Sequence, residues 1–349
     1  MKIKLILLTV LCLIVPVVAQ DVTTEKTATD VAKEENPEEK QIKFIKDTIM
    51  FGIQDERRDA MNRILQIKDE KGRAELNDIL IELLETELNS EAKMRALTII
   101  GQLNLGKGIE QIEKLLDDRS EEIRAAAVNT LNTLNAVSTA PKLIELLKEL
   151  PTDKDSLYHE ALITAIGNFK SKDMVEFAQT TIDNNRTIAN LRERFLLYLV
   201  RLDDPELGEY FLKMAKNEDE EVNMRAYAIN GLWRIGNAEY TGAIKEILTE
   251  IDSYPLNRRR RFNTLSIYAV TALVKLGDTD ATPRLMDALR DNNASTRIRA
   301  VQLLKELQDK RTIDILKYKM NHDQNDRVRR ISREALIEMG EIEKDNADN

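Results

Sequence analysis

The chain has 349 residues, of which 61 are acidic and 52 basic, and its formal net charge at pH 7 is −9. Without a strong positive charge it lacks the electrostatic attraction on which nucleic-acid binding depends, and we expect no nucleic-acid partner. It has two histidines and a single cysteine, Cys12. One cysteine cannot form a disulfide framework, and removal of the N-terminal segment that contains Cys12 would exclude thiol chemistry as well.

Residues 1–19 predict a secretory signal peptide. Lys2 and Lys4 precede an apolar run from Leu5 to Val18, and the small residue Ala19 ends the segment. A positive start, a short apolar core and a small final residue are typical of such signals, and about 14 apolar residues are too few for a comfortable membrane span. We expect an exported protein, periplasmic in the simplest case, with no integral span after cleavage. A retained anchor, wider secretion and membrane association are the alternatives.

Two acidic segments flank the rest of the chain. Residues 20–40 lack any apolar period and carry 7 acidic against 3 basic residues, and residues 341–349 carry 4 against 1. Low apolar content and a charge excess are typical of disordered segments. We therefore predict a disordered acidic linker and a disordered acidic tail on either side of one domain, residues 41–340, whose charge is nearly balanced.

This domain repeats one short pattern nine times. An aliphatic marker residue recurs at spacings of 36, 31, 35, 33, 33, 41, 31 and 32 residues. A residue that is small in seven of nine cases stands four positions before it, and another apolar residue stands three positions after it. Offsets of 4 and 7 lie on one face of a helix. The markers are Ile64, Ile100, Leu131, Ile166, Leu199, Leu232, Leu273, Leu304 and Leu336.

Charged residues keep the same register. A basic residue stands seven positions before most markers, and an acidic residue often stands six positions earlier again. An acid there can cap the incoming helix and face the base of the same repeat or the next. We predict a ladder of such contacts. Its bases are Arg57, Lys93, Arg124, Arg192, Arg225, Arg297 and Arg329, and its acids are Glu87, Asp118, Asp153, Asp219, Asp291 and Asp323.

The phrases MRALTIIGQL, IRAAAVNTLNTL, MRAYAINGLWRIG and RIRAVQLLKEL resemble the HEAT-repeat family, especially its short variant related to phycobilisome-lyase repeats. The resemblance covers about residues 50–340. It implies an all-α fold, an alpha-alpha superhelix of about nine antiparallel helix pairs stacked into a curved solenoid, with Asp and Arg forming the ladder. Each pair would contact only its neighbours. We expect the helix at Gln41–Phe51 to cap the first repeat.

The sequence gives little support for catalysis. His159-Glu160 resembles one piece of the His-Glu motifs of deoxyhypusine hydroxylase, a HEAT-repeat enzyme that binds two irons, but that class needs several such motifs. His159 occupies a ladder-base position, where we expect a structural role. Gly106 and Gly108 fit an inter-helix turn better than a phosphate cradle. We predict no enzymatic activity and no cofactor. The lyase resemblance could suggest chromophore attachment, which export disfavours.

One region departs from the pattern. The 41-residue spacing places extra residues at Asp252–Asn257, followed by the four arginines of Arg258–Arg261. In this repeat Ser266 replaces the ladder base and Arg260 stands in the place of the ladder acid. Aromatic residues gather between Phe195 and Tyr268. Because arginine, tyrosine and tryptophan are favoured at interface hot spots, the insertion and the adjoining concave face are a candidate contact site. The candidate residues are Tyr254, Arg258, Arg259, Arg260, Arg261, Phe262, Tyr240 and Trp233.

A structural interpretation stands beside this one. The aromatics would fill gaps between helices, and the arginines would pair with Glu218–Glu221. We predict a non-enzymatic exported scaffold that binds a protein partner. The first alternative is an envelope-associated adaptor that binds an anionic lipid or glycan through Arg258–Arg261, and the second is a metal enzyme or lyase-like subunit.

Overall fold

The computed structural model describes residues 37–343, with the side chain of Thr279 left out. The predicted signal peptide, most of the predicted linker and the last six residues of the predicted tail lie outside this range. Helix α1 begins at Pro37, four residues before the predicted start of the domain. None of the described helices is both long and apolar enough to cross a membrane.

The described chain is all-α, and it contains 19 α-helices and no strand. The helices form nine antiparallel pairs, each an outer helix followed by an inner helix. The inner helices are α2 (Gln54–Ile64), α4 (Ser90–Gln102), α6 (Glu121–Thr133), α8 (Leu157–Asn168), α10 (Ala189–Arg201), α12 (Val222–Ile235), α15 (Asn263–Lys275), α17 (Ala294–Leu307) and α19 (Asp326–Glu338).

The outer helices are α1 (Pro37–Phe51), α3 (Glu70–Thr86), α5 (Ile109–Lys114), α7 (Ala140–Glu149), α9 (Val175–Asp183), α11 (Gly208–Lys216), α13 (Tyr240–Ser253), α16 (Thr282–Ala288) and α18 (Ile313–His322). The short helix α14 (Leu256–Arg259) is extra and lies in the turn of the seventh pair. Short 3-10 segments lie at Gly106–Gly108, Leu115–Asp117, Val137–Thr139, Pro205–Leu207, Arg260–Phe262, Thr279–Ala281 and Lys310–Thr312.

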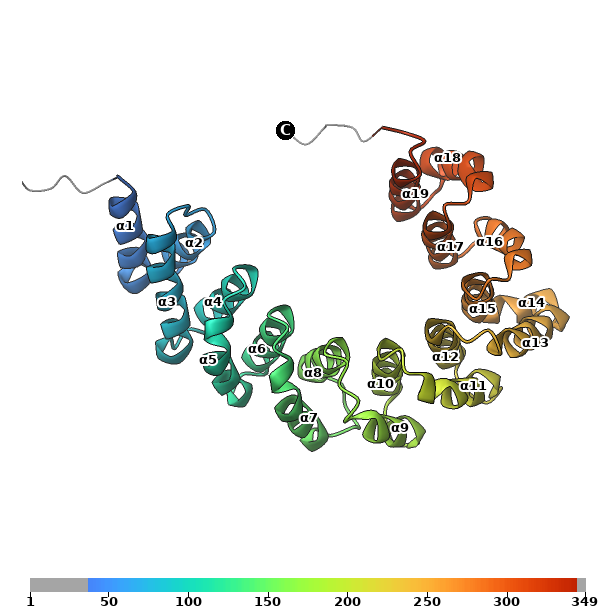
Figure 1. Cartoon of the computed structure of the whole chain (residues 1–349), viewed down its shortest axis with the longest axis horizontal. Helices are drawn as coiled ribbons and strands as arrows, with labels where there is room; N and C mark the ends of the chain where they lie inside the picture. Colours follow the sequence, from blue (N-terminus) through green and yellow to red (C-terminus); the bar gives the residue numbers. More distant parts are fainter. Residues whose placement is uncertain (1–36, 344–349) are drawn as a thin grey trace, which may run out of the picture.

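The pairs stack side by side into a curved solenoid, as the repeat period predicted (Figure 1). The nine inner helices line the concave side of the arc, and the outer helices line the convex side. Each inner helix packs directly against the inner helices of the neighbouring repeats. We call the surface that these helices expose on the concave side the inner surface.

The predicted pairing had one error, which concerns α1. We expected α1 to cap the array, which would make each marker helix the first of its pair. Instead α1 packs against α2 as the outer helix of the first pair and buries Ile42, Ile45 and Ile49. The marker helix is therefore the second helix of every pair. A period read from sequence cannot distinguish the two phases, because both give the same spacing.

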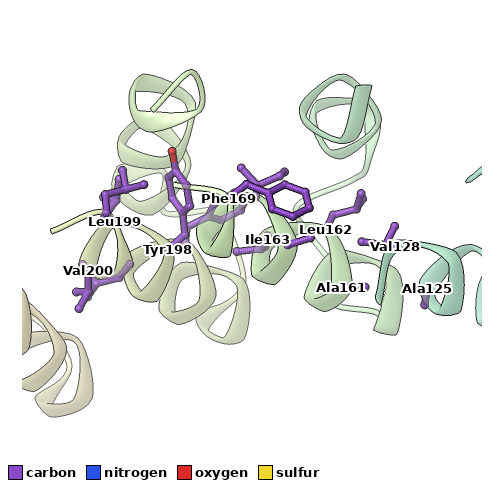
Figure 2. Packing of buried hydrophobic residues seen from close by; sticks show 14 of the residues in the cluster. Ala125, Val128, Ala161, Leu162, Ile163, Phe169, Tyr198, Leu199 and Val200 are labelled. Carbon is purple, nitrogen blue, oxygen red and sulfur yellow. The ribbon is translucent and has the colours of Figure 1, made fainter. Parts of the chain in front are cut away.

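The marker register forms the core. Every marker residue is at most 3% exposed, and so is every residue four positions earlier. Residues three positions after the markers lie at helix ends and are buried or half-buried. Figure 2 shows part of this continuous core, with Val128 of α6, Leu162 of α8 and Leu199 of α10. Small residues before most markers let adjacent inner helices approach closely, so the solenoid has one core along its length.

The inner helices end in one recurrent backbone turn. In eight repeats the residue four positions after the marker has a positive φ, and the next amide often donates to the marker carbonyl, as Leu105 does to Ile100 at 3.0 Å. A left-handed residue with this bond is a common helix ending. The eight residues are Asn104, Asn135, Lys170, Asp203, Gly236, Gly277, Gln308 and Gly340.

Candidate functional site

The ladder bases join neighbouring repeats. Arg192 pairs with Glu220 at 2.7 Å, and Arg225 with Glu250 at 3.5 Å, so each base reaches an acid near the end of the next outer helix. The base also caps its own outer helix, as when Arg225 Nε donates to the Ala215 carbonyl at 2.9 Å. Further pairs join Arg57 to Glu87, Lys93 to Asp118 and Arg297 to Asp323.

Parts of the predicted ladder differ in the structure. Glu220 takes the place that we assigned to Asp219, because its carboxylate is the one that faces Arg192. Asp153 is exposed and pairs with no base among residues 37–343. Arg124 donates to the Asp118 carbonyl and lies 4.9 Å over the Tyr158 ring, and Arg329 donates to the Asp323 carbonyl.

His159 performs the ladder-base role without a charge. Its Nε2 lies 3.0 Å from the Pro151 carbonyl, which can only accept, so Nε2 is the donor. Nδ1 then accepts from the Ser156 hydroxyl at 3.0 Å. Burial lowers the pKa of His159 below its ordinary value. Both ring nitrogens are thus used in capping the preceding turn, and within residues 37–343 no cluster of three or more His, Cys, Asp or Glu is placed to hold a metal.

The insertion lies on the convex side of the arc, in the turn between α13 and α15 (Figure 1). The rings of Tyr254 and Phe262 are 5.2 Å apart, and the Arg258 guanidinium lies 3.9 Å over Tyr254. Arg260 and Arg261 are exposed and form no hydrogen bond or ion pair with the described residues. The expected pairing of the four arginines with Glu218–Glu221 is absent from residues 37–343.

Arg259 restores the ladder in this repeat. Its Nη2 donates to the carbonyls of Asp252 and Tyr254, which end α13, as a ladder base does elsewhere. Asn263 supplies the other half, because its side-chain amide donates to Asp291 at 2.8 Å. The two contacts together replace the base missing at Ser266. Arg259 is therefore part of the framework.

The structure separates Trp233 and Tyr240 from the other candidate residues. Tyr240 begins α13 and Tyr254 follows its end, about 20 Å away at 1.5 Å per helical residue, while Trp233 belongs to the last turn of α12. The Tyr240 hydroxyl lies against Gly208, where an added Cβ would be 1.9 Å from it. Trp233 donates to Asn230 at 2.7 Å and lies 5.7 Å from the Lys275 ammonium. The eight candidate residues therefore do not form one site.

The inner surface has a groove between α4 and α6. It has a volume of about 310 Å³ and is lined only by residues of inner helices, so it opens on the concave side. Its lining carries no charge. Hydroxyl and amide groups come from Thr98, Gln102, Asn129 and Thr133. Such groups can donate to and accept from the backbone of a bound peptide.

A second groove of about 350 Å³ lies between α15 and α17, and again only inner helices line it. The Arg299 guanidinium lies 5.1 Å over the ring of Tyr268, which meets Tyr227 edge to face at 6.0 Å. The other polar residues of the lining are Arg327, Gln302, Thr264, Ser295 and Thr296. The grooves lie at two ends of one surface, the first neutral and the second basic and aromatic.

Residues 77–155 and 258–337 match the family model for HEAT repeats. These two segments carry HEAT repeats. The two matched HEAT segments include the inner helices that form both grooves. No curated protein sequence matches the chain.

Three solved structures are similar in fold. They are the complex of CpcE and CpcF of phycocyanin lyase from Nostoc sp. PCC7120, at 20% identity and a TM-score of 0.40; human deoxyhypusine hydroxylase in complex with glycerol, at 17% and 0.34; and a mutant of Kap121p, at 12% and 0.46. The alignments cover 82%, 77% and 86% of this chain and 99%, 97% and 37% of the other chains, respectively.

The second groove was not predicted from the sequence. The sequence feature that could have predicted it is the position five residues before the marker, which lies on the inner surface in successive repeats. Tyr227, Tyr268 and Arg299 occupy it in α12, α15 and α17. The insertion, which breaks the register, lies on the other side of the arc.

Proposed function

We propose that this HEAT-repeat solenoid is an exported, non-enzymatic scaffold that binds another protein along its inner surface. The observation that carries the proposal is the pair of grooves on this surface, one between α4 and α6 and one between α15 and α17. Hydrogen-bonding side chains line both. No marker or ladder residue lines either groove, and exposed lining residues such as Thr98, Asn129 and Arg327 are available to a partner.

The spacing of the grooves supports an extended partner segment. They are five inner-helix steps apart, and helices pack 8–10 Å apart, which gives about 45 Å. An extended chain spans about 3.3 Å per residue, so about 14 residues would reach from one groove to the other. Solenoids use such extended concave surfaces for binding.

The test is a cross-linked capture from the cell envelope with the mature protein as bait. Thr98→Arg with Asn129→Arg fills the first groove with bulk and charge, and we expect the variant to lose the captured protein. Glu145→Arg, an exposed change on outer helix α7, is the matched control. A partner captured equally by all three baits would contradict the inner-surface assignment.

The insertion supports a second candidate, an adaptor for an anionic lipid or glycan, because Arg260 and Arg261 are exposed without partners in the described chain. A variant in which Glu replaces Arg258, Arg260 and Arg261 leaves the structural Arg259 in place. Flotation with vesicles of phosphatidylglycerol, lost in this variant and at high salt, would favour the adaptor. If the protein floats equally with phosphatidylglycerol vesicles and with neutral vesicles, the adaptor function is rejected.

A further inference from the structure

Arg299 differs from the arginines that occupy the same register in other repeats. Arg95 of α4 donates from Nε to the Asn62 side chain at 2.6 Å. Arg194 of α10 pairs with Asp155 and Glu160, each at 3.0 Å. Arg299 forms no hydrogen bond or ion pair with any described residue, and its Nε is buried without an acceptor.

The surroundings of Arg299 explain how an unpaired guanidinium is held. The ring of Tyr268 lies under it at 5.1 Å, and Tyr227 supports that ring from the next helix. Stacking on a ring uses the face of the guanidinium and leaves its N–H edge for an acceptor. Because buried N–H groups in proteins nearly always have an acceptor, the buried Nε of Arg299 indicates one that comes from outside the described chain.

The groove supplies no acceptor with a negative charge. No Asp or Glu lines it, although two arginines do. Arg327 is exposed, and its side chain has no hydrogen bond or ion pair within residues 37–343. Thr264, Ser295 and Gln302 add neutral donors. Two unpaired guanidinium groups with neutral donors form a site for a carboxylate, which arginine can bind through two parallel hydrogen bonds.

We propose that the groove between α15 and α17 binds an acidic side chain of an extended partner segment, with Arg299 and Arg327 as the donors to its carboxylate and Tyr268 as the apolar floor. The proposal rests on the proposed function and adds the chemistry of the partner. The neutral groove between α4 and α6 would hold the uncharged part of the same segment. The scaffold would thus select a segment with an acidic residue toward the α15–α17 end.

The test is a selection of displayed random 16-residue peptides on the mature protein. We expect the enriched peptides to be rich in Asp and Glu. A synthetic enriched peptide, measured by fluorescence polarisation, should bind Arg299→Gln/Arg327→Gln at least tenfold more weakly. The control Arg290→Gln/Arg311→Gln removes the same charge from exposed arginines outside the groove and should bind within twofold of the wild type. Circular dichroism checks that both variants are folded.

The other outcomes overturn the proposal in distinguishable ways. Enriched peptides without acidic residues, or acidic peptides that bind the groove variant unchanged, would reject the carboxylate site and leave the scaffold intact. No enrichment at all would reject the scaffold as well.

Discussion

The pair between Arg297 and Asp323 should be essential for the C-terminal repeats. Arg297 donates to the two oxygens of Asp323 at 2.9 and 2.8 Å and to the carbonyls of Asp291 and Asn292 at 2.8 and 3.0 Å. The Asp323 side chain is 2% exposed, and its other donors are the Lys319 ammonium at 3.1 Å and a backbone amide. Arg297→Met removes two of its four hydrogen bonds.

Removing one partner of a buried pair costs about 3–5 kcal/mol. Because Lys319 stays beside the carboxylate, we expect a loss near the lower end, about 3 kcal/mol. Each pair of helices contacts only its neighbours, so the damage should be local. Hydrogen exchange should show lost protection in α16–α19 and native protection in α2–α8.

Urea unfolding followed by circular dichroism gives the size of the loss. Arg290→Met removes an exposed pair with Asp287 and should change stability by less than about 0.5 kcal/mol. Replacing both partners, Arg297→Met with Asp323→Leu, should recover much of the loss because no charge is then left buried. A loss below about 1 kcal/mol for Arg297→Met, or exchange that rises evenly along the solenoid, would refute the reasoning.

Three further predictions follow from single sites. Burial would raise the pKa of Asp323, but hydrogen bonds from Arg297, the Asn325 amide and Lys319 outweigh this effect and lower the pKa from 3.8 to about 2. The ionised carboxylate should therefore contribute about 2 kcal/mol of stability above pH 4, and this contribution should disappear between pH 4 and 2. An acid titration in which Asp323→Asn behaves like the wild type would disagree. Burial lowers the pKa of His159, so the neutral form stabilises the fold and stability should fall as the pH drops below about 6.5; an NMR titration that places its pKa above 6.5 would count against this. An added Cβ at Gly231 would lie 2.6 Å from the Phe211 ring, so Gly231→Ala should cost about 1–3 kcal/mol in thermal unfolding, while Gly242→Ala, in open space within α13, should stabilise by about 0.4–1 kcal/mol; equal effects would show that ring contact is not the cause.

The sequence predicted the parts of the fold that depend on periodic burial. Spacings of 31 to 41 residues between markers identified all nine inner helices, because each marker must be buried for its pair to stack. Of the recurrent turns that end eight inner helices, three have a glycine at the left-handed position, the residue type that would indicate such a turn. Lys170 and Gln308 adopt the same positive φ at the same register, although their types do not favour it. Packing on both sides of the turn sets that conformation, and packing is not visible in a single turn's sequence.

The binding surface was less predictable for a different reason. The insertion was recognised because it breaks the period, yet Arg259 within it compensates for the missing base at Ser266. This compensation depends on how the turn folds back against the end of α13. The groove at Arg299 keeps the period perfectly and shows no anomaly in sequence. Its one distinguishing feature, a guanidinium without an acceptor, appears only when its neighbours are known.

The most direct measurement of the central claim is site-specific photo-cross-linking of the protein in the cells that produce it. A photoreactive phenylalanine would replace Asn129 or Gln302, which line the two inner grooves, or Glu145 or Tyr318, which are exposed on outer helices. The account predicts that one partner protein is cross-linked from both inner positions and from neither outer position. Cross-links from the outer helices alone, or equally from all four positions, would contradict it.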